Sequence, residues 1–178
     1  MTANSSDRLM FGLISDTHSH TDPDAWAEAF HGATAIFHAG DIGHQNVLDT
    51  LNEIAPTIAV KGNIDGGDLR FLPEVEQRTF ARKKIVMLHI AGSPKRPNKH
   101  TRRLLVHEQP DILLVGHSHI PTVQRVDHGC LWINPGAAGT HGFHPERVAM
   151  RLFINTFNGE LSLERVCFGP RVPQQNHT

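Results

Sequence analysis

Five apolar segments of strand length occur along the chain, and each is followed within about two residues by an aspartate, asparagine or histidine. Short apolar runs of this kind are typical of strands buried in a sheet. The polar groups that follow them are Ser15-Asp16-Thr17-His18, Gly40-Asp41, Gly62-Asn63, His89 and Gly116-His117-Ser118-His119. Because open α/β sheets bind ligands outside the carboxyl ends of their strands, we expect these side chains to gather at one edge.

The first third of the chain alternates predicted strands and helices. Strands are expected over residues 9–15, 34–39 and 57–61, and helices over residues 24–31 and 46–55. The second helix has Val47, Leu48, Leu51 and Ile54 on one face, which is the periodicity of an amphipathic helix. This βαβαβ order predicts a parallel sheet covered by helices.

The rest of the chain favours hairpins. Paired strands are expected over residues 75–80 with 84–88, 122–127 with 130–134, and 148–155 with 160–167. Asp127-His128-Gly129 and Asn158-Gly159 are the turn signals, and the second predicts a type I′ turn. A helix over 99–107 and a buried strand over 111–115 lie between the hairpins. Two sheets inside and helices outside would satisfy both parts of the chain.

Composition limits the class of protein. With 178 residues, 39% hydrophobic and 20% charged, the chain predicts one soluble domain over residues 9–169, with flexible tails at 1–8 and 170–178. Because no apolar run is long enough to cross a membrane and residues 1–8 are polar, we expect neither a membrane span nor a signal peptide. A net charge of -1 does not indicate a basic surface for nucleic acid, so no stable nucleic-acid complex is expected. Two cysteines form no disulfide framework, and we expect a cytoplasmic protein.

Seven side chains at the strand ends could bind metal: Asp16, His18, Asp41, Asn63, His89, His117 and His119. They offer nitrogen and oxygen donors and no thiolate, and they exceed what one four-coordinate zinc ion needs. The set suits two divalent cations that share a bridging carboxylate. The mixture of imidazole and oxygen favours Mn²⁺, with Fe, Zn and Ni as further possibilities.

The order of these motifs resembles the calcineurin-like metallophosphoesterase superfamily, and the short chain is similar to its small bacterial and archaeal phosphodiesterase branch. The resemblance implies a four-layer α/β/β/α sandwich, with two mixed sheets flanked by helices and a dinuclear centre between the sheets. It also implies one metal on Asp16, His18 and His119, a second on Asn63, His89 and His117, and Asp41 as the bridge.

The resemblance further implies a reaction. A hydroxide between the metals, held by Asp41, would attack phosphorus in line, and the substrate would be a small phosphorylated molecule. A phosphodiester is the expected substrate class. The oligomeric state stays open, and a homo-oligomer is compatible with the sequence.

The chain departs from the family pattern after the third strand. Many members have a histidine at the position of Ile64, and that histidine is often assigned as the general acid. Here the acid is left open among His20, His44 and His144. Asp65 remains, and we expect it to support the ligands from behind without binding metal.

Two further groups are candidates for contacts with the substrate. His144 and Arg147 follow the Asn134-Pro135-Gly136 turn. An arginine there could bind a phosphate oxygen through the N–H groups of its planar guanidinium. The basic residues between 95 and 103 form either a solvated helix face or a surface that steers anionic substrates.

Two functions other than phosphodiester hydrolysis are compatible with the same fold. A scaffold on the same fold, like the retromer subunit of this superfamily, should have lost ligands, whereas this chain keeps all seven. A nuclease acting on short oligonucleotides is compatible with the chemistry, but the near-neutral charge argues against long nucleic acids.

Overall fold

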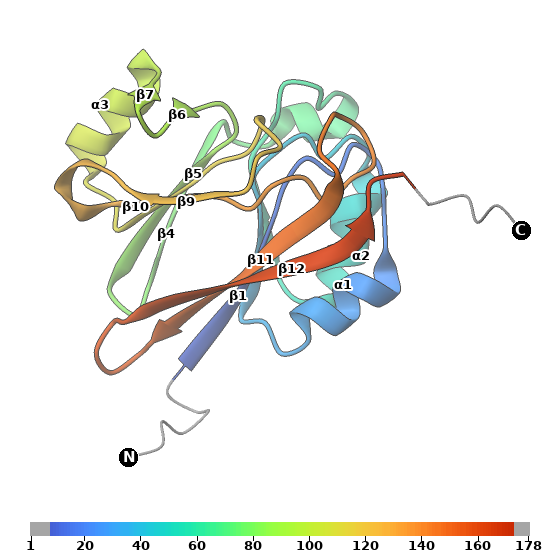
Figure 1. Cartoon of the computed structure of the whole chain (residues 1–178), viewed down its shortest axis with the longest axis horizontal. Helices are drawn as coiled ribbons and strands as arrows, with labels where there is room; N and C mark the ends of the chain where they lie inside the picture. The colour runs from blue at the N-terminus through green and yellow to red at the C-terminus, as the bar shows by residue number, and fades with distance from the viewer. Residues whose placement is uncertain (1–7, 173–178) are drawn as a thin grey trace, which may run out of the picture.

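Two five-stranded sheets stack face to face in the structure, a computed structural model that describes residues 8–172 (Figure 1). The first sheet has the order β12-β11-β1-β2-β3 and the second the order β4-β5-β8-β10-β9. The strands of the first sheet are β1 (Arg8–Ile14), β2 (Ala35–His38), β3 (Thr57–Ala59), β11 (Glu146–Asn155) and β12 (Leu161–Pro170). Those of the second are β4 (Val75–Phe80), β5 (Lys83–Leu88), β8 (Ile112–Leu114), β9 (Thr122–Arg125) and β10 (Leu131–Asn134). A small ladder joins β6 (Gly92–Ser93) to β7 (Arg96–Pro97).

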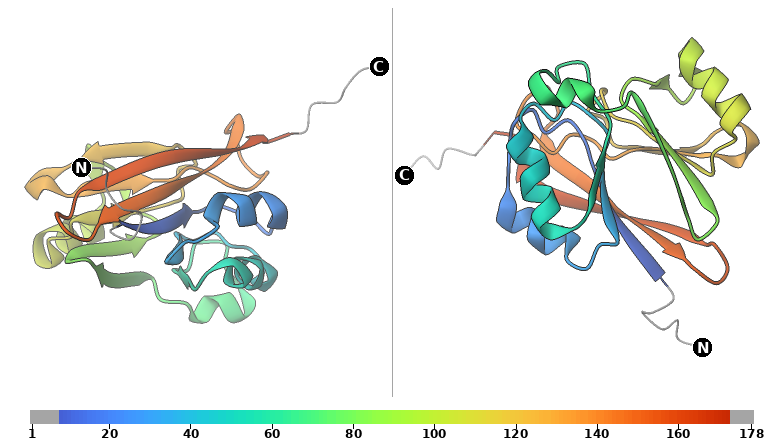
Figure 2. Two further views of the ribbon diagram at one scale, coloured as in Figure 1. Left: turned by 90° about the horizontal axis from the view of Figure 1, so that it is seen from below. Right: turned by 180° about the vertical axis from the view of Figure 1, so that it is seen from behind.

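Helices cover the two outer faces. The α-helices are α1 (Pro23–Phe30), α2 (Gln45–Ile54) and α3 (Lys99–Glu108), and two 3₁₀ segments are η2 (Gly67–Phe71) and η3 (Asp127–Gly129). Figure 2 shows α1 and α2 on one side of the stacked sheets and α3 on the other. The expected four-layer α/β/β/α sandwich is therefore confirmed, and the three expected helices begin and end within one residue of their predicted bounds.

Both sheets are mixed. Strands β1, β2 and β3 are parallel neighbours, as the alternation of strands and helices predicts, and β11 pairs antiparallel with β1. In the second sheet the central pairs β5–β8 and β8–β10 are parallel, whereas the outer pairs β4–β5 and β9–β10 are antiparallel. Strand β8 lies between the β4–β5 and β9–β10 hairpins and is parallel to its neighbour in each. The second sheet therefore contains more parallel pairing than the hairpins in the sequence suggest.

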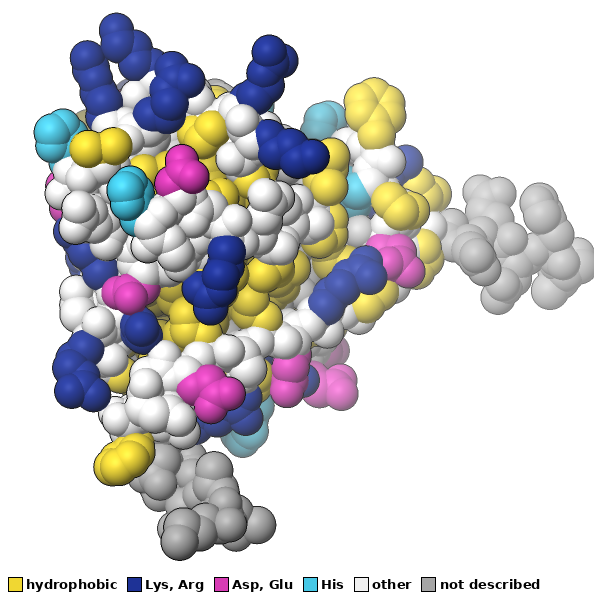
Figure 3. Space-filling view, turned by 60° about the vertical axis from the view of Figure 1, so that its left-hand side comes forward, with side chains coloured by type: hydrophobic (Ala, Val, Ile, Leu, Met, Phe, Trp, Pro, Cys, Tyr) yellow, Lys and Arg dark blue, Asp and Glu magenta, His cyan; other side chains and the backbone are white. Residues whose placement is uncertain are grey.

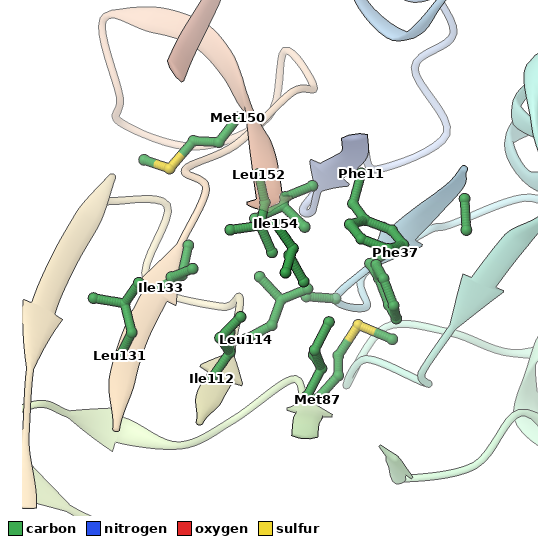
Figure 4. Close-up of a cluster of buried hydrophobic side chains, with 14 of the residues drawn as sticks. Phe11, Phe37, Met87, Ile112, Leu114, Leu131, Ile133, Met150, Leu152 and Ile154 are labelled. Carbon is green, nitrogen blue, oxygen red and sulfur yellow. The ribbon is translucent and has the colours of Figure 1, made fainter. Parts of the chain in front are cut away.

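The main core lies between the sheets. Figure 4 shows side chains from both sheets meeting there, with Phe11 and Phe37 from the first sheet opposite Met87 and Leu114 from the second. A second cluster packs Trp26 and other residues of α1 and α2 against the outer face of the first sheet, and a third packs α3 against the second. The inner strands β2, β8 and β10 are buried along their whole length, which explains the continuous apolar runs in the sequence.

Gly12 lets α1 approach the first sheet closely. It lies on the outer face of β1, where a Cβ atom would stand 2.8 Å from Cδ1 of Phe30. Phe30 is itself fully buried, so it has little room to give. A side chain at position 12 would push α1 away from the sheet that carries Asp16 at its end.

Two predicted boundaries and one predicted turn need correction. Arg8 begins β1 and Pro170 ends β12, so these residues are not parts of tails; positions 1–7 and 173–178 lie outside the described residues. The β11–β12 connection is not a type I′ turn, because Gly159 has a positive φ whereas Asn158 does not. It is a longer loop closed by hydrogen bonds between the backbones of Asn155, Gly159 and Glu160.

Across residues 8–172, no helix is long and apolar enough to span a membrane.

Candidate metal centre

The carboxyl ends of β1, β2, β3, β5 and β8 deliver all seven predicted ligands to one edge of the sandwich, at the top of Figure 1. Five of these residues have positive φ angles: Asp16, His18, Asp41, His117 and His119. This conformation costs free energy in residues other than glycine, and it persists where the surrounding structure holds it. Its concentration at the strand ends marks this edge as a functional site.

Asp16, His18 and His119 form a first group of metal-binding side chains, in which one ligand atom of each lies within 4.8 Å of the others. The Nε2 atom of His119 is 3.3 Å from Oδ1 of Asp16 and 3.4 Å from Nε2 of His18. Asp16 is fully buried, and the backbone N–H of His117 donates to its carboxylate. These contacts hold the carboxylate in position.

Asp41, His89 and His117 form a second group with the same spacing. Asn63 belongs with them, because its Oδ1 atom lies 3.1 Å from Nε2 of His89 and 2.9 Å from Nδ1 of His117. The structure therefore brings these side chains together in the two groups that the family resemblance implies, and their binding of metal stays a prediction.

The carboxylate of Asp41 lies between the two groups. Its Oδ1 atom is 3.1 Å from Nε2 of His89, and its Oδ2 atom is 3.6 Å from Nε2 of His18. The backbone N–H of Ile64 also donates to Oδ1, at 3.2 Å. One oxygen faces each group, which is the arrangement that a bridging carboxylate needs.

The orientation of His89 is set by the backbone. Its Nδ1–H donates to the carbonyl oxygen of Ala39 at 2.8 Å, which leaves the Nε2 lone pair directed at the site. Burial lowers the pKa of His89, but the hydrogen bond to Asp41 and the charges of Asp16 and Asp41 raise it by more. Burial likewise raises the pKa of Asp41, while His89 and the Ile64 N–H hold it below its ordinary value. A metal ion at this group must therefore compete with a proton on His89.

Two buried polar side chains support the ligand loops from behind. Asp65 accepts hydrogen bonds from the backbone N–H groups of Gly43 at 2.8 Å and Gly62 at 2.7 Å, so it joins the loops after β2 and β3. His38 accepts from the Gly40 N–H through Nδ1, and its Nε2 lies 3.0 Å from Oγ1 of Thr17. Thr17 in turn donates to the carbonyl of Ile42, which ties the loop after β1 to the loop after β2.

The donor set fits divalent cations. Both groups consist of imidazole nitrogens and carboxylate or amide oxygens, which are ligands typical of Mn, Fe, Zn and Ni. Three of the four histidines in the two groups are partly or fully shielded, and the carboxylates are buried. The buried carboxylates of Asp16 and Asp41 call for compensating positive charge.

Two candidates from the sequence lie away from the centre. The Nη1 atom of Arg147 is 2.8 Å from Oδ2 of Asp22 and 2.6 Å from Nε2 of His20, and its Nη2 atom donates to the carbonyl of Phe168. Arg147 therefore ties α1 to the end of β12, and it does not line the cavity at the ligands. Burial, together with the charge of Arg147, lowers the pKa of His20, so a smaller fraction of it carries the proton that a general acid must donate.

The other two candidates for the general acid have different surroundings. His44 is exposed at the N-terminus of α2, where its Nδ1 atom accepts from the Asn46 N–H, and it lies outside the cavity. His144 lines the cavity and packs beside His119 with ring centroids 5.3 Å apart. Its Nε2 donates to the carbonyl of Gly139, and burial lowers its pKa. Neither arrangement presents an acidic proton to a leaving group.

A cavity of about 690 Å³ opens over the centre, and its lining includes residues that are not among the predicted site residues. His141 stacks near His18 with ring centroids 4.7 Å apart, and Arg165 and Phe143 line the wall. Arg165 lies in the middle of β12 without any motif around it, so its position depends on the pairing of β12 with β11. No motif in the sequence predicts that this arginine, rather than Arg147, reaches the cavity.

The basic residues between 95 and 103 lie on α3 and just before it, on the far side of the second sheet from α1 and α2. Figure 3 shows Lys and Arg side chains gathered at the top of the face that carries this helix. His100, on the same helix, shares a small cavity with Asn63 and His89. The N-terminal turn of α3 therefore borders the second ligand group.

Comparisons with known proteins identify the family of the chain. A model of the calcineurin-like phosphoesterase superfamily domain matches residues 9–156. A probable metallophosphoesterase of Methanocaldococcus jannaschii is 33% identical over 134 residues, which cover 72% of this chain and 68% of the relative. A probable metallophosphoesterase of Mycoplasma pneumoniae is 31% identical over 156 residues, or 84% of this chain and 91% of that relative.

Solved structures share the architecture. A single mutant of Vps29 from Entamoeba histolytica has a TM-score of 0.70 at 22% identity, covering 90% of this chain and 100% of that one. A predicted phosphoesterase from Streptococcus pneumoniae has a TM-score of 0.63 at 20% identity, with 89% and 98% covered. At these identities the likeness concerns the fold alone. The family match and the two curated relatives show that this protein belongs to the calcineurin-like phosphoesterase superfamily.

Proposed function

We propose that this protein is a phosphodiesterase that hydrolyses a small phosphodiester with two divalent cations, of which Mn²⁺ fits the donors best. One cation would be held by Asp16, His18 and His119, and the other by Asn63, His89 and His117, with Asp41 shared. The observation that carries the proposal is the position of Asp41, whose two oxygens face the two groups.

The bound cations would supply positive charge beside the phosphate and a water whose pKa lies near neutrality. The chain's own residues set the charge around them. Asp41 would reduce the repulsion between two cations, and Asn63 is neutral, so the site stays attractive to an anionic phosphate. The hydrogen bond from His89 to Ala39 keeps its ring oriented, so little reorganisation is needed when a ligand arrives.

The leaving group receives little help from the protein. Ile64 stands where many family members have a histidine, and its apolar side chain lines the cavity. The attacking water releases a proton to solvent as its oxygen bonds to phosphorus, the ester P–O bond breaks, and the departing oxygen takes a proton from solvent. This arrangement favours substrates whose leaving group is already a weak base.

A substrate panel tests the proposal. The protein is stripped with a chelator, reloaded with Mn²⁺, Zn²⁺ or Ni²⁺, and assayed with aryl phosphomonoesters, aryl phosphodiesters and short oligonucleotides. We expect diester hydrolysis that disappears on chelation and returns with metal. A preparation that binds two metals per chain and hydrolyses no ester would show a scaffold instead. Turnover of monoesters alone would show that the substrate class is wrong.

A further inference from the structure

Exposed apolar side chains surround the mouth of the metal centre. Ile64 is 45% exposed, Ile120 is 64% exposed and Phe143 is fully exposed. Each is the sequence neighbour of a polar residue of the site, since Ile64 follows Asn63, Ile120 follows His119 and Phe143 precedes His144. Together with Pro121 and Pro145 they line the same cavity as the ligands, and we refer to these five residues as the apolar rim.

The cavity is larger than a phosphate requires. Its volume of about 690 Å³ lies in the range of pockets that enclose a whole small molecule. The ligand groups occupy the floor, so the space beside the rim is left for whatever is attached to the phosphate. Apolar walls above a charged floor match a phosphate ester with an apolar organic group.

The rim suits a planar ring better than an aliphatic chain. Phe143 presents a whole aromatic face, and aromatic rings attract one another in offset or edge-to-face arrangements. Arg165 lines the same cavity, and its guanidinium is held 2.6 Å from the carboxylate of Glu146. A planar guanidinium also stacks on aromatic faces.

The position of Phe143 is coupled to the centre. Its neighbour Gly142 has a φ of 115°, and a Cβ atom there would lie 2.4 Å from Nδ1 of His119. On its other side His144 donates to the carbonyl of Gly139, and Arg171 donates to the carbonyls of His144 and Thr140. The loop backbone is thus held on both sides of Phe143, which places this residue at the mouth of the cavity.

The geometry points to an aromatic ring, joined to the phosphate of the substrate, as the group that occupies the apolar rim. This inference rests on the proposed function and narrows its substrate class to aryl-type phosphate esters. Continuity between the rim and the ligand groups in one cavity is what favours a part of the substrate over a second protein as the occupant.

Ligands that cannot be hydrolysed test the inference without turnover. The affinities of the metal-loaded protein for phenylphosphonate, cyclohexylphosphonate and methylphosphonate are measured by calorimetry. We expect phenylphosphonate to bind about tenfold more tightly than methylphosphonate, with cyclohexylphosphonate between them. Phe143→Ala should remove most of the preference for phenyl, and Ile120→Ser should weaken it. Phe157→Ala is the matched control, since Phe157 is 87% exposed in the β11–β12 loop and does not line the cavity.

Each result has a separate meaning. Equal affinities for the three ligands, or a phenyl preference that survives in Phe143→Ala, would overturn the inference. A phenyl preference that depends on Phe143, in a protein that hydrolyses no ester, would support the rim assignment and contradict the proposed function. If sedimentation velocity shows a dimer that Phe143→Ala converts to monomer, the rim is an interface between copies and the inference is wrong.

Discussion

The Oδ1 atom of Asp41 lies 3.1 Å from Nε2 of His89, although the two residues come from loops of different sheets. This contact joins the carboxyl end of β2 to that of β5. The opposite oxygen of the same carboxylate faces His18. Asp41 therefore couples the two ligand groups, and its substitution should affect both.

Asp41→Asn should lower hydrolysis by about 10²–10³-fold, because the amide removes a negative charge that both cations would share. Metal content, measured by elemental analysis, should fall below that of the parent protein. The control is Asp68→Asn, which changes an exposed carboxylate on η2 outside the cavity. Activity within a few-fold of the parent, with unchanged metal content, would contradict the bridging role.

The rate should depend steeply on the acidity of the leaving group. Ile64 cannot donate a proton, and general acids contribute most when a basic oxygen departs, by roughly 10²–10⁴-fold. A series of aryl methyl phosphates with graded phenol pKa values measures this dependence. Ile64→His should flatten the series, provided that the Asp65 contacts keep the loop in place. A flat series in the parent, with chemistry rate-limiting, would reveal another acid in the site.

His38 should make the fold sensitive to acid. It is fully buried, and burial lowers its pKa to about 4, against 6.5 for an exposed histidine. Below pH 6.5 the unfolded chain binds this proton and the native protein does not, so the free energy of unfolding falls as the pH drops towards 4. At pH 5 the loss is about 2 kcal/mol.

Urea unfolding at pH 7.5 and pH 5 checks this expectation, with a chelator present so that metal binding does not contribute. His38→Gln, which cannot take up the proton, should lose about 2 kcal/mol less than the parent between these pH values. Equal losses in the two proteins would show that His38 is not the group responsible.

Asp65→Asn should destabilise the protein by about 1–3 kcal/mol, because one of two buried backbone N–H groups loses its acceptor. The two donors are those of Gly43 and Gly62, which belong to the loops that carry Asp41 and Asn63. We therefore expect weaker metal binding as well as a lower melting temperature. A variant that melts early but binds metal with unchanged affinity would mean that Asp65 is needed for stability alone.

Much of the fold could be predicted because it depends on local pattern. The runs that become β1, β2 and β8 are buried on both faces, so consecutive residues in them are apolar. The polar residues directly after them follow the strand direction, which parallel pairing fixes. This is why the clustering of all seven predicted ligands could be predicted without knowing how the loops fold.

The errors concern contacts that form between distant segments. Arg147 and Arg165 are both arginines on the last hairpin, yet the first is bound to Asp22 and Phe168 while the second lines the cavity. Their placement depends on how β11 and β12 pair and on where α1 ends. His141 was likewise placed by the folding of its loop against His18, which no spacing rule describes.

The number of metal ions per chain tests the central claim most directly. The protein is freed of metal, titrated with Mn²⁺, and analysed for bound metal and for hydrolysis of an aryl phosphodiester at each point. The account predicts saturation at two ions per chain, with activity rising on the second. Saturation at one ion per chain with full activity would contradict the two-cation centre and the role of Asp41 as its bridge.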